Sequence, residues 1–342
     1  MSEQSNLILL FGGTSSERRV SVASAKHLSS VLTAADLWFW SPSGQIISVQ
    51  AATLAAHENV FDNDFKPANT VIIGETIDAA IAAVGDRVLF LGLHGGDGEN
   101  GFLQSKLEAK KIPFTASAST ASALAMDKGR SKDAVRPCGV LMAKQLLFTV
   151  SDPGIGATLG QFQKSVKDIV IKPSCDGSSS GLAFLGSPQE CEAWLQTNKQ
   201  SKDSWLAEER INGRELTVGV ISHNGCMMAL PPSEVILERN ATFNFQAKYH
   251  GVGNREITPA ELTAREAAAA QTVSLLAHSA IGCFGYSRTD MIMTPKGLYF
   301  LETNTLPGMT IASFMPQQLR AAGIGFKDFI DHQLLLAKLR YT

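Results

Sequence analysis

The sequence predicts an α/β fold with a parallel sheet in its first third. Two segments there read as a buried strand, a glycine turn and a helix: NLILLFGG (6 to 13) leads into SERRVSVASAKHLSSVL, and DRVLFLGLHGG (86 to 96) leads into ENGFLQSKLEAKK. Repeated units of this kind form parallel sheets, which place ligands at the carboxyl ends of their strands. The 342 residues are enough for about two domains of about 150 residues each.

Composition and charge exclude several kinds of partner. The formal net charge is −2, the pI is about 6.4, and no basic block occurs, which argues against nucleic acid and anionic membranes. The five cysteines are scattered without Cys-x-x-Cys spacing, so we expect no disulfide framework, no structural zinc and a cytoplasmic location. No stretch approaches about eighteen apolar residues and the amino terminus lacks a basic region, so neither a membrane span nor a signal peptide is expected.

The segment IKPSCDGSSSG (171 to 181) is a candidate phosphate-binding loop. It follows the β-branched run DIVIK and precedes the apolar run LAFL, a pattern that predicts strand, loop and strand. A P-loop is excluded because Lys172 precedes the glycines and a strand follows them. Two alternatives stay open: an ordinary solvated hairpin, or a flap whose backbone N–H groups and serine hydroxyls close over a polyphosphate, with Lys172 at its base.

The segments on either side of this loop predict further elements. A helix is expected around ASALAMDKGRSKDAV (121 to 135), before the loop. In the last third, Thr258 and Glu261 predict a capping box, Pro259 the first helical position and Gly282 the residue after the helix. The polar segment ERNATFNFQAKYHGVGN (238 to 254) has little periodicity, and a loop of this length is more often functional than idle.

After that helix, YSRTDMIMT (286 to 294) and GLYFLETNT (297 to 305) predict a hairpin. Alternation places Arg288 with Asp290 and Glu302 with Asn304, so strand pairing can bring all four side chains together. The intervening apolar residues are expected to face a core: Met291, Met293, Tyr299 and Leu301. A surface salt bridge is the plain alternative, but carboxylate and amide oxygens are ligands that Mg²⁺ uses together with phosphates and water, so we expect use of a nucleoside triphosphate.

These motifs, taken in order, resemble the ATP-grasp superfamily and, within it, the D-alanine:D-alanine ligases, from FGGTSSERRVS near the start to LETNTLPGMT near the end. The resemblance implies an ATP-grasp architecture: an N-terminal parallel α/β domain (1–116) and two α+β subdomains that clamp ATP (117–215 and 216–342). It also implies ligation of two D-alanine molecules through an acyl phosphate for peptidoglycan precursor synthesis. The family is similar to homodimers, so the resemblance also implies a homodimer. Alternatives are a related ligase that takes D-lactate, D-serine or another amino acid second, and a nucleotide-binding protein without catalysis.

The resemblance implies a nucleotide and metal site. Lys172 and Lys128 resemble the lysines on the phosphates, and EERI (208 to 211) resembles the hinge that hydrogen-bonds adenine. Glu215 stands in the position that holds the ribose hydroxyls. The full implied ATP set is Lys128, Lys172, Glu208, Glu209, Ile211 and Glu215. Two Mg²⁺ ions, for which Mn²⁺ could substitute, are implied at Asp290, Glu302 and Asn304.

The resemblance also implies an amino-acid site. Glu17 resembles the carboxylate that receives the first ammonium, and Ser178 and Tyr249 resemble the residues that link with it to close the site. Arg288 and the backbone N–H of Gly308 resemble the oxyanion donors. Four further substrate-binding residues are implied: His94, Glu99, Lys248 for the transferred phosphoryl group, and Ser313 for the second carboxylate. Ile311 and Ala312 replace a more polar pair beside that pocket, which bears on its selectivity.

Overall fold

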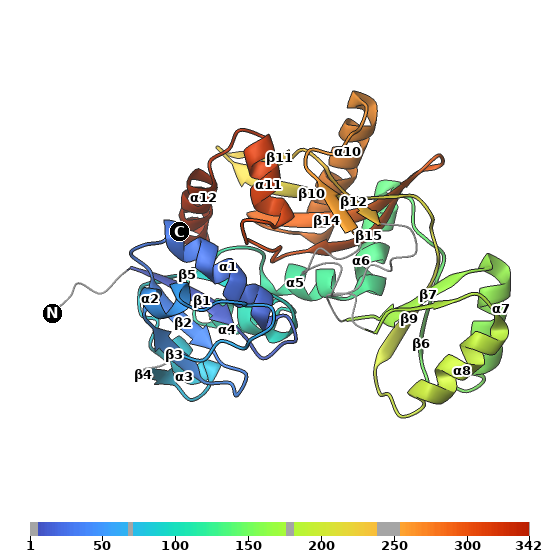
Figure 1. The fold of residues 1–342 in the computed structure, drawn as a ribbon, viewed down its shortest axis with the longest axis horizontal. Coiled ribbons are helices and arrows are strands. Elements are labelled where there is room, and N and C mark those ends of the chain that lie inside the picture. Colours follow the sequence, from blue (N-terminus) through green and yellow to red (C-terminus); the bar gives the residue numbers. More distant parts are fainter. Residues whose placement is uncertain (1–5, 68–70, 176–180, 238–253, 342) are drawn as a thin grey trace.

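The structure is a computed structural model that describes residues 6–67, 71–175, 181–237 and 254–341. The residues in these ranges form three sheets, and Figure 1 shows the N-terminal sheet at one end of the molecule, a small sheet at the other and a large sheet between them. Three predicted site residues, Ser178, Lys248 and Tyr249, lie outside the described residues. Within the described part of the chain, no helix is long and apolar enough to cross a membrane.

The N-terminal sheet has the strand order β4-β3-β2-β1-β5. Its strands are β1 (Leu7–Gly12), β2 (Asp36–Trp40), β3 (Ile46–Val49), β4 (Val71–Gly74) and β5 (Val88–Leu93). The predicted parallel pairing is confirmed for β1 with β2 and for β1 with β5. The antiparallel strands β3 and β4 were not predicted. The helices of this unit are α1 (Arg18–Val31), α2 (Ala51–Ala55), α3 (Ile77–Ala82), the 3₁₀ turn η1 (Gly96–Gly98) and α4 (Phe102–Ala109).

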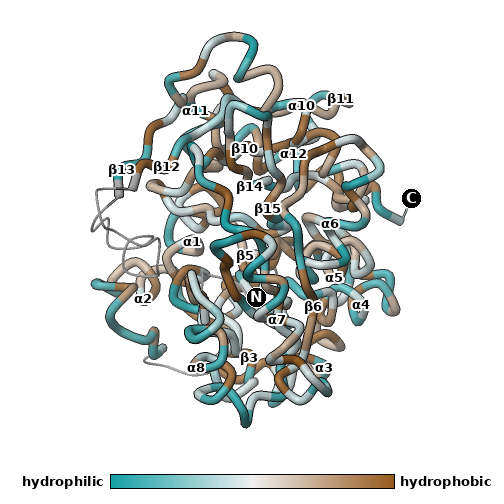
Figure 2. The backbone as a smooth tube through the Cα atoms, turned by 90° about the vertical axis from the view of Figure 1, so that its right-hand side faces the viewer, coloured by the Kyte–Doolittle hydropathy of each residue, from teal (hydrophilic) through white to brown (hydrophobic). Residues whose placement is uncertain are grey.

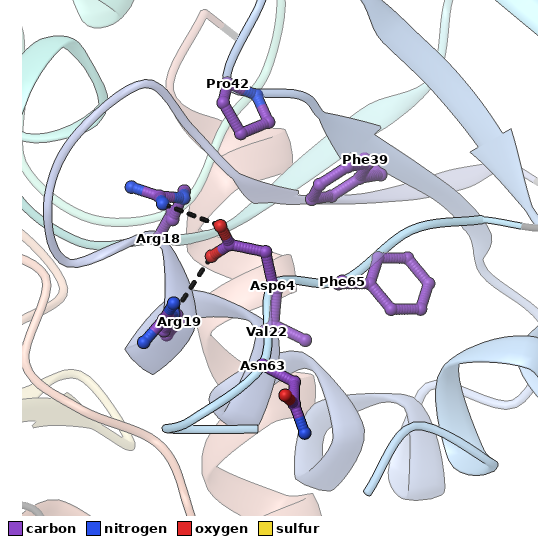
Figure 3. A pocket seen from close by; sticks show the side chains of 8 residues that line it. All are labelled: Arg18, Arg19, Val22, Phe39, Pro42, Asn63, Asp64 and Phe65. Atoms are coloured by element: carbon purple, nitrogen blue, oxygen red, sulfur yellow. Dashed lines mark hydrogen bonds and ion pairs between the residues drawn. The ribbon is translucent and has the colours of Figure 1, made fainter. Parts of the chain in front are cut away.

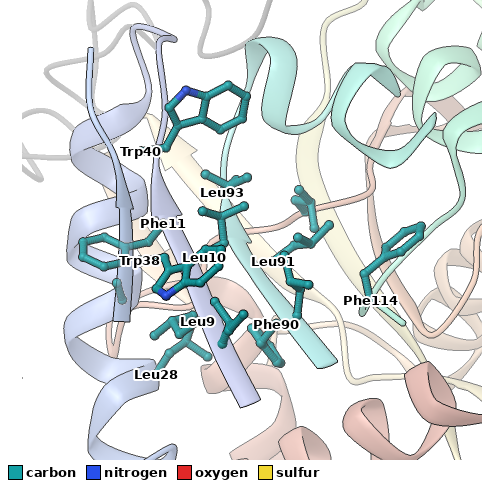
Figure 4. Close-up of a cluster of buried hydrophobic side chains, with 14 of the residues drawn as sticks. Leu9, Leu10, Phe11, Leu28, Trp38, Trp40, Phe90, Leu91, Leu93 and Phe114 are labelled. Carbon is teal, nitrogen blue, oxygen red and sulfur yellow. The ribbon is translucent and has the colours of Figure 1, made fainter. Parts of the chain in front are cut away.

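The core of this unit fixes the two loops that carry predicted site residues. Figure 4 shows Leu9, Phe11 and Phe90 from the central strands packed with Leu28 from α1. Each of these four side chains has no exposed surface, as expected where helices cover both faces of parallel strands. The carboxyl ends of β1 and β5 are therefore held side by side, and the chain after each end leads directly into the candidate site.

The large sheet has the strand order β13-β12-β10-β14-β15, with β11 paired to β10. Its strands are β10 (Arg214–His223), β11 (Cys226–Ala229), β12 (Ser233–Leu237), β13 (Asn254–Ile257), β14 (Tyr286–Thr294) and β15 (Gly297–Asn304). The helices around it are α5 (Ser119–Met126), α6 (Lys128–Val135), the 3₁₀ turn η2 (Arg136–Cys138), α10 (Ala264–Ile281), α11 (Phe314–Ala321) and α12 (Phe326–Leu339). Figure 2 shows apolar and hydrophilic stretches alternating along these elements, as expected for elements that bury one face.

Two helix predictions need correction. The capping box of α10 joins Thr263 and Glu266, not Thr258 and Glu261, because the Ala260 N–H donates to the Pro232 carbonyl and keeps that segment in a turn. Gly282 does follow the helix, with φ of 79°. The single helix expected around ASALAMDKGRSKDAV is two helices, because Asp127 is extended and its side chain accepts from the N–H of Arg130, 3.0 Å away.

The small sheet has the order β6-β9-β7-β8. Its elements are β6 (Gln145–Thr149), α7 (Ile155–Val166), β7 (Ile169–Pro173), β8 (Ala183–Leu185), α8 (Pro188–Asn198) and β9 (Ser204–Glu209). The predicted strand–loop–strand is confirmed, because β7 pairs antiparallel with β8. Ala125 of α5 and Val135 of α6 pack with Phe300 of the large sheet. The domain boundaries at 116/117 and 215/216 stay a proposal.

Candidate active site

The hairpin of β14 and β15, here called the acidic hairpin, brings together the four side chains predicted to meet. Arg288 lies opposite Asn304, and Asp290 lies opposite Glu302. The Arg288 guanidinium donates to both carboxylate oxygens of Asp290, at 2.9 and 2.8 Å, and the Asn304 amide donates to Asp290 Oδ2 at 3.1 Å. No group of three or more His, Cys, Asp or Glu side chains in the described ranges is placed to hold a metal, so the implied metal site depends on the oxygen of Asn304.

The apolar side of the hairpin differs in part from the prediction. Met291 is fully buried as expected. On β15, however, Leu298 and Phe300 are buried, whereas Tyr299 and Leu301 are only half-buried. The register shifts between Asp290 and Met291, so strict alternation does not continue past this point.

Two of the predicted phosphate lysines face carboxylates from different elements. Lys128 Nζ, on the first turn of α6, is 3.2 Å from Glu302 Oε2. Lys172 Nζ, on β7, is 2.5 Å from Glu208 Oε2 on β9. The backbone N–H of Lys128 donates to the Ser174 carbonyl at 2.9 Å, which joins α6 to the end of β7. The cations and the acidic hairpin therefore lie in one site between the small and large sheets.

Sequence reasoning missed a third lysine of this site. Lys132 lies one helical turn after Lys128, has no exposed surface and contacts Glu208. Burial, together with the neighbouring charge of Lys172, lowers the pKa of Lys132. The spacing of four residues places both lysines on one face of a helix, and this was the available signal.

The other two hinge residues lie at the end of β9 and just after it. Glu209 is the last residue of β9, and its N–H donates to the Lys144 carbonyl at 2.9 Å. Ile211 lies beyond the strand end and is half-buried. Glu215 is the second residue of β10 and lies close enough to Lys172 for its charge to favour the protonated lysine. The hinge segment thus runs past the lysines, with the Glu208 side chain directed toward them.

Glu17 meets the loop after β5. It is the N-cap residue of α1, and its Oε2 would lie 2.5 Å from a Cβ added to Gly95. A side chain at position 95 would therefore collide with the carboxylate, and Gly95 also has a φ of 64° that favours glycine. The FGGTSSERRVS segment, which carries Glu17, therefore lies against the HGGDGENG segment after β5.

An arginine pair holds the turn that carries Glu17. Asp64 accepts from Arg18 Nη2 and from Arg19 Nε, both at 2.9 Å, and Figure 3 shows the two guanidinium groups directed toward this carboxylate. The guanidinium groups lower the pKa of Asp64. These pairs are partly exposed, so each contributes at most about 1 kcal/mol. Sequence reasoning missed Asp64, because residues 30 to 80 carry no recognisable motif.

His94 joins three segments. Its Nδ1 donates to the Leu306 carbonyl at 2.7 Å, and its Nε2 lies 2.9 Å from the Ser24 hydroxyl on α1. Because a carbonyl can only accept, the proton is on Nδ1 and Nε2 accepts from Ser24 in the neutral ring. The Ser24 oxygen in turn accepts from the Met309 N–H at 3.1 Å. The contacts of His94 thus position the loop after β15 on the N-terminal unit.

Glu99 makes a second connection between the same loops. Its Oε2 accepts from the Gly95 N–H at 2.9 Å, and its Oε1 accepts from the N–H groups of Thr305 and Leu306 at 3.1 and 2.9 Å. Burial, and next the nearby charge of Glu17, raise the pKa of Glu99 to about 7.

We expect this raised pKa to make folding stability depend on pH. The pKa of Glu99 is about 7 in the folded protein and about 4.5 in the unfolded chain. The contribution of Glu99 to folding stability is therefore complete below the unfolded pKa and is lost as the pH rises through the folded pKa. Between about pH 4 and pH 8, the free energy of unfolding of the wild type should fall by about 3 kcal/mol more than that of Glu99→Gln. Urea unfolding of both proteins at each pH measures this. Equal losses in the two proteins would contradict the assignment, since all other groups are shared.

The loop after β15 also carries Gly308 and Ser313. A Cβ added to Gly308 would lie 2.7 Å from Ser313 Oγ, and that oxygen accepts from the Thr310 N–H at 3.1 Å. Ser313 is the N-cap residue of α11, and the Arg288 guanidinium lies 6.0 Å from the ring of its neighbour Phe314. The predicted oxyanion donors and the predicted second-substrate residue therefore lie in one region.

The fold consists of an N-terminal α/β unit, a small sheet that carries the half-buried Lys172, and a large sheet with the acidic hairpin. This combination defines an ATP-grasp ligase. The models of the D-ala D-ala ligase N-terminus and C-terminus match residues 6–117 and 161–335. The chain belongs to the D-alanine–D-alanine ligase family.

Individual relatives cover almost the whole chain. A D-alanine–D-alanine ligase of Syntrophobacter fumaroxidans is 33% identical over 337 residues, which are 98% of this chain and 98% of that protein. The VanG D-Ala:D-Ser ligase from Enterococcus faecalis superposes with a TM-score of 0.79 at 26% identity, over 97% of this chain and 98% of its own. The D-alanine–D-alanine ligase from Bacillus anthracis complexed with ATP has the same fold, with a TM-score of 0.71 at 23% identity, over 97% and 96% of the two chains.

Proposed function

We propose that this protein uses ATP to join two D-alanine molecules, giving D-alanyl-D-alanine, ADP and phosphate for peptidoglycan precursor synthesis. The observation that carries the proposal is the convergence of two predicted half-sites. Buried lysines and the acidic hairpin form the nucleotide half, and Glu17, Gly308 and Ser313 form the amino-acid half. The names of the relatives that match the whole chain support the same substrates.

The chemistry needs activation because a carboxylate is a poor acyl donor. The first D-alanine carboxylate attacks the γ-phosphorus of ATP, ADP leaves, and an acyl phosphate forms. The second amine then attacks the acyl carbon, gives up a proton, and the tetrahedral intermediate collapses with loss of phosphate. Lys128 and Lys172 are proposed to neutralise the phosphoryl oxygens, and Arg288 with the Gly308 N–H to stabilise the oxyanion.

Two magnesium ions are proposed at the acidic hairpin. The residues fit this role, because strand pairing places Asp290 opposite Glu302 and a hydrogen bond ties Asn304 to Asp290. Their hard oxygens suit Mg²⁺ or Mn²⁺. When bound, the ions would neutralise charge on the nucleotide phosphates. The chain's own cations Arg288 and Lys128 hold these carboxylates in the structure described.

The other residue roles follow from the family resemblance. Glu17 is proposed to bind the first ammonium, Lys248 the transferred phosphoryl group and Ser313 the second carboxylate. Ser178 and Tyr249 are proposed to close the site with Glu17. His94 and Glu99 are proposed to act through the loops that they tie together. A cytoplasmic homodimer is proposed on the same resemblance.

The half-buried position of Lys172 predicts a pH-dependent ATP affinity. Burial lowers the pKa of Lys172 to about 8, so the protonated form that would bind phosphates is lost as the pH rises through this value. The KM for ATP should rise about tenfold near pH 9. Steady-state kinetics of the wild type and of Lys172→Arg, whose side chain stays charged, measure this. Identical pH profiles of KM in the two proteins would show that Lys172 is not the titrating group.

Phosphate release from Mg-ATP with D-alanine as the added amino acid tests the proposal. A D-serine or D-lactate product is the second candidate, favoured by the likeness to a D-Ala:D-Ser ligase and by the exposed Ile311 beside Ser313. The mass of the product separates the candidates.

A further inference from the structure

One carboxylate serves two lysines at the nucleotide half of the site. Glu208 Oε2 is 2.5 Å from Lys172 on β7, and its other oxygen contacts Lys132 on α6. Lys132 is fully buried, and Glu208 is 4% exposed. Buried charges persist in folded proteins when they are paired, and removing one partner leaves the other uncompensated. Glu208 is therefore the shared counter-ion of both lysines.

This sharing matters because Lys172 is proposed to bind the nucleotide phosphates. A lysine held by a carboxylate alone must break that ion pair before it can contact a phosphate, and the carboxylate would then remain buried without a counter-ion. In this protein Lys132 contacts the other oxygen of Glu208, so this carboxylate would keep a counter-ion if Lys172 moved to a phosphate. The free energy needed to break the Lys172–Glu208 ion pair is therefore lower.

We propose that Lys132 is a positioning residue for nucleotide binding, which neutralises Glu208 so that Lys172 can pass from this carboxylate to the phosphates. The inference rests on the proposed function, since it assumes that Lys172 meets those phosphates. Lys132 touches neither substrate nor nucleotide in this account.

The neighbouring lysine does not share this role. Lys128 lies one turn earlier on the same helix and pairs with Glu302 at 3.2 Å, so its charge is directed to the acidic hairpin. Helix α6 packs against α10 and β15 of the large sheet, whereas Glu208 and Lys172 belong to the small sheet. The Lys132–Glu208 contact thus also fixes the small sheet against the helix that carries Lys128.

The proposal predicts opposite effects for one and for two substitutions. In Lys132→Met, Glu208 keeps Lys172 as its counter-ion, so Lys172 is withheld and binding of phosphates weakens. In Lys132→Met/Glu208→Gln, the carboxylate charge is removed as well, so Lys172 is released and binding of phosphates recovers. A residue that only supports the fold predicts no recovery, because the double variant loses more of the native contacts.

Calorimetric titration with ADP and with adenosine, in the presence of Mg²⁺, separates these outcomes. The ratio of the adenosine Kd to the ADP Kd reports the phosphate contribution and cancels any change at the adenine hinge. We expect this ratio to fall about tenfold in Lys132→Met and to return to within about twofold of wild type in the double variant. Arg130→Met removes an exposed cation from the same helix and should leave the ratio unchanged.

Each outcome has a definite meaning. A wild type that binds neither ligand would overturn the proposed function itself. If the wild type binds ADP, two results would overturn the role of Lys132: an equal loss of ADP and adenosine binding in Lys132→Met, or a double variant whose ratio does not rise above that of Lys132→Met. If Lys132→Met does not fold, the double variant decides alone, because it removes both buried charges together: a ratio at the wild-type level supports the proposal, and a tenfold lower ratio contradicts it.

Discussion

Lys172→Met is expected to lower kcat/KM for ATP by about a thousandfold, the largest effect of any single substitution outside the metal ligands. Lys172 is half-buried near the end of β7, its Nζ lies 2.5 Å from Glu208 Oε2, and the charges of Glu302 and Glu215 favour its protonated form. Its charge is proposed to stabilise the phosphoryl oxygens as negative charge moves onto ADP. Methionine keeps the length of the side chain and removes the charge, so packing is preserved while the electrostatic contribution is lost.

The measurement is steady-state kinetics with varied ATP at saturating amino acid. Lys164→Met is the matched control, because Lys164 lies exposed on α7 of the same unit and should change kcat/KM less than about twofold. The melting temperature of both variants is recorded, so that loss of fold is separated from loss of catalysis. A change of less than about threefold in Lys172→Met would rule out the phosphate role.

Arg288→Met is expected to lower kcat by a factor of about 10² to 10³, with the KM for ATP changed little. Arg288 is 8% exposed. Its guanidinium is oriented by two hydrogen bonds to Asp290 and lies 6.0 Å from the ring of Phe314, just after the loop with Gly308. A donor that is fixed in advance stabilises charge that develops in the transition state more than it stabilises the bound substrates. The loss should therefore appear in kcat.

Two further variants test whether the loss in kcat comes from the oxyanion role of Arg288. Arg288→Lys keeps the charge but not the planar pair of donors, so its kcat should lie between those of wild type and Arg288→Met. Arg320→Met removes an exposed cation from α11 and should behave as wild type. If Arg288→Met raises the KM values while kcat stays constant, the arginine binds substrates in the ground state and is not an oxyanion donor.

Local patterns predicted the parts of the site that one element or one hairpin determines. Strand alternation grouped Arg288 with Asp290 and Glu302 with Asn304, because side chains two residues apart on a strand share a face. The register shift after Asp290 then places the two groups opposite each other. The β-branched run before Lys172 likewise predicted the strand that carries this lysine.

Features that depend on distant segments were not predicted from the sequence. In the sequence, Lys132 is indistinguishable from an ordinary lysine on a helix surface, because its partner Glu208 lies on β9, far away in the chain. The Thr-x-x-Glu pattern occurs twice before α10, and a hydrogen bond from Ala260 to Pro232 decides which copy caps the helix. The register shift after Asp290, which buries Phe300 in place of its neighbours, also has no clear sequence signal.

The most direct test of the account is phosphate release from Mg-ATP with D-alanine alone, compared with L-alanine and with D-alanine plus D-serine or D-lactate, with the product mass recorded. The account predicts release with D-alanine alone and a product with the mass of D-alanyl-D-alanine. Release only with a second, different substrate would keep the ligase chemistry and reassign the pocket beside Ile311 and Ser313. No release with D-alanine under any of these conditions would contradict the proposed function.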